Sequence, residues 1–204
     1  NTLIGGLAGD ANTTADNNTA VGYNSLGANT TGTYNVAVGA YALDENTTAN
    51  ANTALGYNAG GSLTTGANNI AIGLNALVTS TTGAQNIAIG AYSGDAITDG
   101  TYNVLLGYEA GTGITEGDYN IGIGSSALAA TSTGLANTAV GQSAMLANTT
   151  GGYNVSLGYA ALDANTTASY NVAIGAAALG VNTTGTSNTA VGYAALDANE
   201  TSSS

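Results

Sequence analysis

The side chains of this chain that could take part in chemistry are few and of three kinds. Asn-x-Ser/Thr tripeptides, the acceptor pattern for N-linked glycans, recur along the chain. Two carboxylates, Asp99 and Glu116, occupy equivalent places in consecutive repeats, and the 12 tyrosines are the only aromatic residues. Lys, Arg, His and Cys are all absent. Because no imidazole, amine or thiol is available as base or nucleophile, the sequence predicts neither an enzyme nor a cofactor.

The negative charge of the chain disfavours partners that are themselves negatively charged. Twelve carboxylates without a basic residue give a net charge of −12, which opposes binding to nucleic acid phosphates or anionic lipid headgroups. No apolar run reaches the roughly 20 residues that a membrane-spanning helix needs. We therefore expect no nucleic acid partner and no direct membrane insertion.

A 17-residue repeat fills the chain. Each unit begins with Asn, carries Val, Ile or Leu at position 4 and has Gly at position 5. Twelve such units account for all 204 residues, so residues 1–204 are interpreted as one repeat array, an excerpt of a longer fibre. The units begin at Asn1, Asn18, Asn35, Asn52, Asn69, Asn86, Asn103, Asn120, Asn137, Asn154, Asn171 and Asn188.

The length of the repeat favours an all-β parallel β-solenoid, or β-roll, of twelve coils. It is too short for a helical hairpin repeat, and the β-branched residues at positions 2 and 4 indicate a strand. We expect two short strands per coil, at about positions 2–5 and 11–14, with Gly at position 5 turning a corner. At about 4.8 Å per coil the rod would be about 58 Å long.

Compensating substitutions predict which side chains share the core. Position 9 is Leu or Met in eight units and Gly in four. In three of those four, position 12 becomes aliphatic, as Leu63, Ile97 and Ile114, so positions 9 and 12 are expected to fill one space. We expect position 4 to join them inside the coil. Position 3, mostly Ala, would lie on the opposite face, where a neighbouring chain could approach closely.

The asparagines at position 1 predict a ladder of side-chain amides along the rod. Equivalent residues of stacked strands lie about 4.8 Å apart, within hydrogen-bonding reach of one another. A structural role is therefore favoured over a catalytic one. The expected ladder comprises Asn18, Asn35, Asn52, Asn69, Asn86, Asn103, Asn120, Asn137, Asn171 and Asn188.

Two stretches carry a resemblance to a known family. The segments NVAIGAAAL from Asn171 and NTAVGYAAL from Asn188 resemble the head repeat of trimeric autotransporter adhesins, although that repeat is shorter. The whole unit from Asn18 to Tyr34 is similar to arrays in bacterial surface proteins and phage-like tail fibres. The resemblance implies a left-handed β-roll, a homotrimer or filament made by self-association, and an extracellular fibre at a cell surface or on a virion.

The Asn-Thr-Thr turns leave two interpretations open. Covalent glycans would stand in register along one edge of the rod, whereas a polar turn would use the Thr hydroxyls to cap backbone groups. The candidate glycosylation sites are Asn12, Asn29, Asn46, Asn148, Asn165, Asn182 and Asn199.

The Thr ladders, the carboxylate pair and the tyrosines could each bind a ligand, and each also has a purely structural interpretation. Thr ladders at positions 13 and 14 could order ice, but Asp99 and Glu116 interrupt position 14. That carboxylate pair could hold Ca²⁺, although a solvated acidic spot is favoured and no other metal site is expected. Tyrosines at positions 6 and 17 would cover the strand edges or stack on sugars. The expected function is a structural segment of an extracellular fibre; the alternative is a glycan- or ice-binding β-solenoid.

Overall fold

Each 17-residue unit forms one coil of a parallel β-solenoid in the computed structural model, which describes residues 1–203. Every coil contributes one three-residue strand. Residues 1–203 contain no helix with the length and apolar character that a membrane crossing requires. The strands are β1 (Thr2–Ile4), β2 (Thr19–Val21), β3 (Val36–Val38), β4 (Thr53–Leu55), β5 (Ile70–Ile72), β6 (Ile87–Ile89), β7 (Val104–Leu106), β8 (Ile121–Ile123), β9 (Thr138–Val140), β10 (Val155–Leu157), β11 (Val172–Ile174) and β12 (Thr189–Val191).

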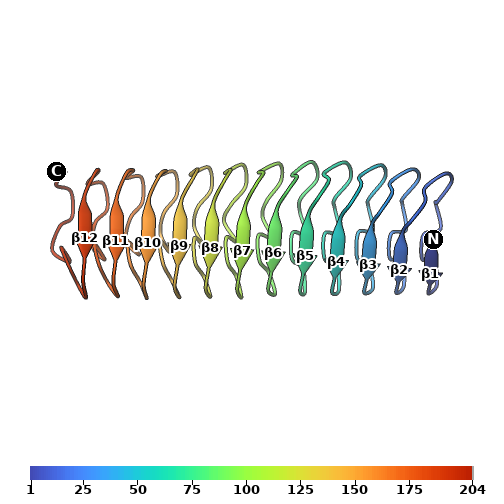
Figure 1. Ribbon diagram of the computed structural model, residues 1–204, viewed down its shortest axis with the longest axis horizontal. Coiled ribbons are helices and arrows are strands. Elements are labelled where there is room, and N and C mark those ends of the chain that lie inside the picture. The colour runs from blue at the N-terminus through green and yellow to red at the C-terminus, as the bar shows by residue number, and fades with distance from the viewer. Residues whose placement is uncertain (204) are drawn as a thin grey trace.

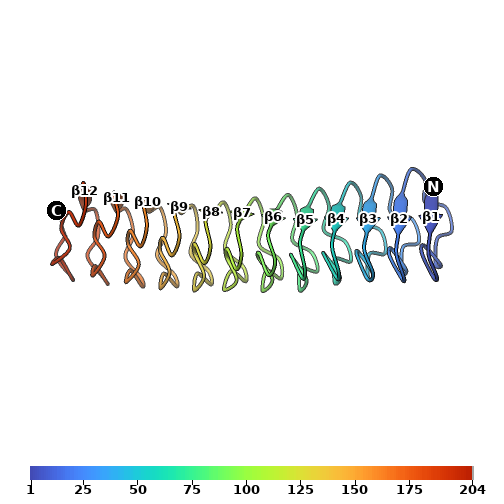
Figure 2. The ribbon, with the colours of Figure 1, turned by 90° about the horizontal axis from the view of Figure 1, so that it is seen from below.

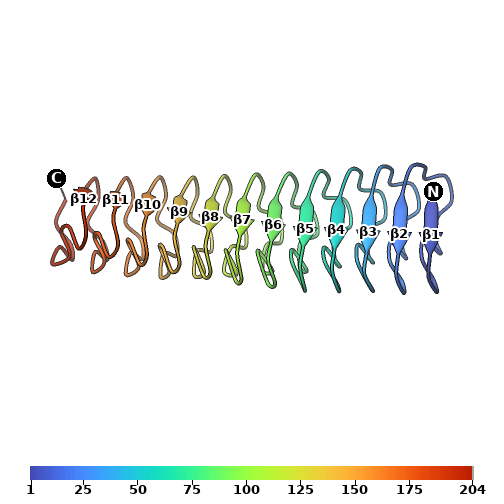
Figure 3. The same ribbon diagram turned by 60° about the horizontal axis from the view of Figure 1, so that its bottom comes forward.

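The strands form a single parallel sheet in the order of the sequence, from β1 to β12. Each residue pairs with its equivalent in the next repeat, as Thr53 of β4 does with Ile70 of β5. Figure 1 shows the strands side by side along the rod, with the two termini at opposite ends. Figures 2 and 3 show that the remainder of every coil lies on one side of the sheet. One side of the rod is therefore a continuous sheet surface.

The second strand expected at positions 11–14 is not formed. In the second coil this segment is a turn followed by a bend at Thr30 and Thr31. Adjacent coils are still joined there, since the Thr30 amide donates to the Thr47 carbonyl at 2.9 Å. The side chain of Asn29 donates to the Gly32 carbonyl three residues on. This tight turn prevents the extended backbone that a strand requires.

The Gly at position 5 turns the corner after each strand, as predicted. Gly124, in the eighth coil, has φ of 132°, a region that residues with a Cβ atom rarely adopt. A Cβ atom at Gly124 would also lie 2.5 Å from the Gly141 carbonyl oxygen of the next coil. Both the backbone conformation and the close stacking of coils therefore require glycine here.

Position 3 of each strand points into the core, and positions 2 and 4 point outward, which is the reverse of the expectation. Position 3 is fully buried in the inner coils, as at Ala173, whereas positions 2 and 4 point outward and Ile174 is 37% exposed. The expectation that position 4 fills the core and position 3 receives a neighbouring chain was wrong. The space inside the coil is narrow, and position 3 shares it with the large residue at position 9, so most coils admit only Ala.

The core space is shared by positions 3, 9 and 12. The exchange between positions 9 and 12 is confirmed: a Cβ atom at Gly111 would lie 3.0 Å from Ile114 Cδ1. The same Cβ atom would lie 2.7 Å from Leu105 Cδ2, which enters from position 3. In the first coil Leu3 fills the space beside Gly9 in the same way. This explains the one unit in which Gly at position 9 has no aliphatic residue at position 12.

Among residues 1–203, three further positions of the coils hold the backbone in the left-handed region. Positions 7, 9 and 17 have φ between 49° and 65° even where they carry Leu, Tyr or Ala, as at Leu43, Tyr119 and Ala177. Such a conformation costs a non-glycine residue roughly 1–2 kcal/mol. Because every coil carries this cost, contacts with neighbouring coils must offset it.

Gly124→Ala should destabilise the rod strongly. Strain at positive φ and the clash with the Gly141 carbonyl should together cost about 3 kcal/mol or more. The urea midpoint, followed by circular dichroism, measures the loss. Gly180→Ala is the matched control, because Gly180 is outside the positive-φ set and its Cβ would lie 3.1 Å from the nearest atom. Equal midpoints for the two variants would contradict the assignment.

Candidate functional site

The asparagines at position 1 form a buried ladder through the rod. The amide N–H of Asn120 donates to Asn103 Oδ1 at 2.9 Å, which joins two coils. Its Nδ2 donates to the Gly134 carbonyl at 2.8 Å, which closes its own coil. Because nearly all their polar atoms are engaged, these amides hold coils together. Buried members are Asn18, Asn35, Asn52, Asn69, Asn86, Asn103, Asn120, Asn137, Asn154, Asn171 and Asn188.

A second asparagine ladder lies at position 12, and the sequence reasoning missed it. Asn165 Nδ2 donates to Asn148 Oδ1 at 2.8 Å and to the Ala168 carbonyl at 3.1 Å. Asn182 repeats both contacts one coil further on. The signal in the sequence is the small residue that follows each of these asparagines by three positions. The fully buried members are Asn29, Asn46, Asn148, Asn165 and Asn182.

Five of the seven candidate glycosylation sites are buried inside the coil. An N-linked glycan occupies Nδ2, which at the five buried positions donates hydrogen bonds inside the closed coil. A glycan attached there would keep the coil open. Asn12 and Asn199, in the end coils, are partly exposed, and they accept from the amides of Ala15 and Ser202 in the same turn. The polar turn is thus the arrangement seen at all seven candidates.

The threonines at positions 13 and 14, considered as an alternative ice-binding surface, differ in what their hydroxyls contact. Hydroxyls at position 13 donate to the carbonyl of the next coil, as Thr149 Oγ1 does to Thr166 at 2.9 Å. The exposed rank is position 14, where Asp99 and Glu116 interrupt the threonines. A single broken rank gives a line of hydroxyls rather than a plane of them, so the geometry does not favour ice binding.

Asp99 and Glu116 lie exposed on neighbouring coils. Asp99 Oδ1 accepts from its neighbour Thr98 Oγ1 at 3.1 Å. Residues 1–203 contain no group of three or more His, Cys, Asp or Glu side chains placed to hold a metal ion. The pair therefore matches the solvated acidic spot more closely than a Ca²⁺ site.

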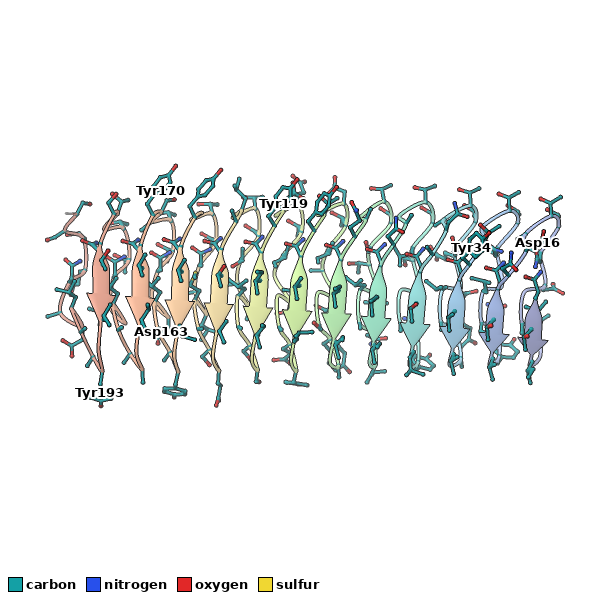
Figure 4. All side chains as sticks on the ribbon, in the orientation of Figure 1. Asp16, Tyr34, Tyr119, Asp163, Tyr170 and Tyr193 are labelled. Carbon is teal, nitrogen blue, oxygen red and sulfur yellow. The ribbon has the colours of Figure 1, made fainter. Side chains whose placement is uncertain are left out.

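The outward residues of the sheet form a continuous surface of Val, Ile, Leu and Thr side chains, which we call the sheet face. It comprises positions 2 and 4 of β1–β12, and Leu55, Ile89 and Leu157 on it are 38–48% exposed. Tyrosines border it on two sides: Figure 4 shows Tyr119 and Tyr170 beyond one end of the strands and Tyr193 beyond the other. Two pairs of the first row, Tyr102–Tyr119 and Tyr153–Tyr170, are stacked at 4.9 and 5.3 Å.

The sheet face carries no charge. All twelve carboxylates lie at positions 7, 10, 11, 13, 14 and 16 of their units, away from positions 2 and 4. The net charge of −12 therefore belongs to the other sides of the rod. The carboxylates are Asp10, Asp16, Asp44, Glu45, Asp95, Asp99, Glu109, Glu116, Asp118, Asp163, Asp197 and Glu200.

The class of protein follows from this architecture. The chain is a parallel β-solenoid built from tandem repeats that each supply one strand, with one uncharged sheet face and an interior filled by Ala, Leu and two asparagine ladders. No family model, no curated protein and no solved structure matches the chain. The class is thus defined by the fold itself.

Three aspartates at position 10 have a pKa above the ordinary value of an aspartate. Burial raises the pKa of Asp44, against a hydrogen bond from Asn24 that lowers it. Burial likewise raises the pKa of Asp95 and Asp163, and the Glu109 charge adds to the effect on Asp95. A raised pKa means that the folded rod binds these protons more tightly than the unfolded chain does.

The rod should therefore gain stability as the pH falls from 7 towards about 4. The contribution of a carboxyl group with a raised folded pKa is fully present below its unfolded pKa and is lost as the pH rises through the folded value. Thermal midpoints measured across this range check the sign. Replacing Asp44, Asp95 and Asp163 together by Asn should flatten the dependence, and a midpoint that falls on acidification would refute it.

Asn120→Ala should break the ladder in the middle of the array. It removes the acceptor of the Asn137 amide and leaves the Gly134 carbonyl without its donor. Buried groups left unpaired cost about 1–3 kcal/mol each, so a loss of about 3 kcal/mol is expected in urea unfolding. Gln142→Ala on the exposed surface is the control and should cost less than about 0.5 kcal/mol. Similar losses for both variants would show that the ladder is dispensable.

Proposed function

We propose that this chain is a structural segment of an extracellular fibre, a shaft or head of an adhesin or tail-fibre-like protein on a cell surface or virion. The observation that carries the proposal is the unbroken register of twelve strands, each paired with its equivalent in the next coil. An array of this kind converts repeat number directly into length. A regular β-solenoid is also typical of structural proteins.

The interior supports a mechanical role. Asn amides, Thr hydroxyls and strand amides all make hydrogen bonds along the rod axis, from one coil to the next. Separating two coils requires many of these bonds to break together, whereas a bend is resisted by the close packing at position 5. The arrangement suits a stiff rod that transmits force along its length.

The sheet face supports self-association into a homotrimer or filament. A surface whose pattern repeats with every coil, at about 4.8 Å, is matched in spacing by another copy of itself. The face is uncharged, so the acidic sides do not oppose contact directly. A strip about 55 Å long and about 10 Å wide, the length of a three-residue strand, offers on the order of 550 Å² per copy, and the bordering tyrosines bring it towards the roughly 800 Å² of a stable interface. The contact proposed here is made by positions 2 and 4, not position 3.

Rod length tests the mechanical role. A chain in which the twelve units are doubled should give rods twice as long in negative-stain electron micrographs, because each coil adds about 4.8 Å. Antibodies against the array should label intact cells or particles of the natural source before permeabilisation. Compact particles, or labelling that appears only after permeabilisation, would refute the extracellular fibre.

Solution mass tests self-association. Ile70→Lys with Ile72→Lys places two charges on the sheet face and should convert an oligomer into monomers in sedimentation equilibrium, with the circular dichroism spectrum unchanged. Thr48→Lys with Thr65→Lys adds the same charge at exposed position 14 and should leave the oligomer intact. A stable monomer of the unmodified chain would contradict association through this face.

A further inference from the structure

A cleft interrupts the regular surface between the sixth and seventh coils. Its volume is about 530 Å³, and its lining residues are Tyr92, Asp95, Tyr108, Glu109 and Thr112. The rings of Tyr92 and Tyr108 meet nearly at right angles, at 89°, with their centroids 6.3 Å apart. Two walls of the cleft are therefore aromatic.

The cleft has negative charge without a counter-charge from its own chain. Glu109 lies close enough to raise the pKa of both Asp95 and the Tyr108 phenol. The chain contains no Lys, Arg or His that could pair with either carboxylate. The Thr112 hydroxyl donates to the Ala129 carbonyl at 3.2 Å, so it offers only lone pairs to a ligand.

These groups select one chemical class of ligand. A cation held over an aromatic ring and beside a carboxylate gains from both interactions. A neutral sugar can stack on a tyrosine ring and donate its hydroxyls to the carboxylates, but it leaves the negative charge of Asp95 and Glu109 uncompensated. A bare metal ion would need more oxygen ligands than two carboxylates, and the described chain offers no group of three. An organic cation fits both the aromatic rings and the two carboxylates.

We propose that the cleft between Tyr92 and Tyr108 binds an organic cation, an ammonium or guanidinium group, with Asp95 and Glu109 balancing its charge. This site is independent of the proposed role of the rod as a fibre. A cation site there would distinguish the sixth and seventh coils from the rest of the repetitive surface.

The third and fourth coils provide a natural comparison within the same chain. Tyr41 and Tyr57 repeat the ring pair, with centroids 5.8 Å apart and an angle of 74°. Asp44 stands where Asp95 does, but Asn58 replaces Glu109. Asp44 is moreover engaged by Asn24 Nδ2. This location therefore has the aromatic walls without a carboxylate in the place of Glu109, and its Asp44 is already partnered, so it should bind cations more weakly.

The test is a titration with tetramethylammonium chloride followed through the NMR ring signals of the tyrosines. We expect saturable shifts of Tyr92 and Tyr108 with a dissociation constant on the order of 1 mM. Glu109→Asn, which copies the comparison location, should weaken binding about fivefold or more. Asn58→Glu should strengthen the response of Tyr41 and Tyr57. Glu200→Gln, in the last coil and far along the chain from both tyrosine pairs, is the control and should change neither.

Three outcomes would overturn the proposal. They are identical shifts with sodium chloride at equal ionic strength, equal responses of the two tyrosine pairs in the unmodified chain, and unchanged affinity in a folded Glu109→Asn variant. A short lysine-containing peptide distinguishes the sources of the cation. Tighter binding of this peptide than of tetramethylammonium assigns the site to a partner's side chain, and weaker binding assigns it to a small quaternary ammonium compound.

Discussion

The close stacking of each coil on the next is the constraint on which the rest of the structure depends. At Gly124 the backbone of one coil comes so near the Gly141 carbonyl that no side chain fits between them. Among residues 1–203, positions 7, 9 and 17 of the coils also lie in the left-handed region, mostly at non-glycine residues such as Leu43 and Tyr119. A coil alone could not maintain these conformations, and the array becomes stable because neighbours impose them on one another.

Hydrogen bonds replace much of the apolar core that a larger domain would have. The ladder at position 1 and, where position 12 is Asn, the second ladder fill the ends of the coils with hydrogen-bonded amides, and Ala and Leu occupy the space between. Buried amides tolerate few alternative partners, so a coil that slipped by one residue would leave them unpaired. The ladders therefore fix the register between coils, while the exchange among positions 3, 9 and 12 lets the apolar part vary at constant volume.

Charge and apolar surface are segregated around the rod. Positions 2 and 4 carry Val, Ile, Leu or Thr without interruption, and the carboxylates lie elsewhere on the coil. Such a division lets copies approach through one side and keeps the other sides solvated. Against this regular background, Glu109 stands out because it adds a carboxylate beside a tyrosine pair at the place where the equivalent pair of coils three and four has Asn58.

The sequence by itself determined the period, the parallel stacking, the position 1 asparagines, the glycine corners and the shared space of positions 9 and 12. Each of these rests on the recurrence of residue types at the same place in every repeat. Only the tertiary structure decided which side of the strand faces inward, because a three-residue strand with Val, Ala and Ile in succession, as in β11, is apolar on both sides. It also decided that Asn29 and Asn165 turn inward, since an Asn-Thr-Thr turn has the same sequence whether its amide meets water or the next coil.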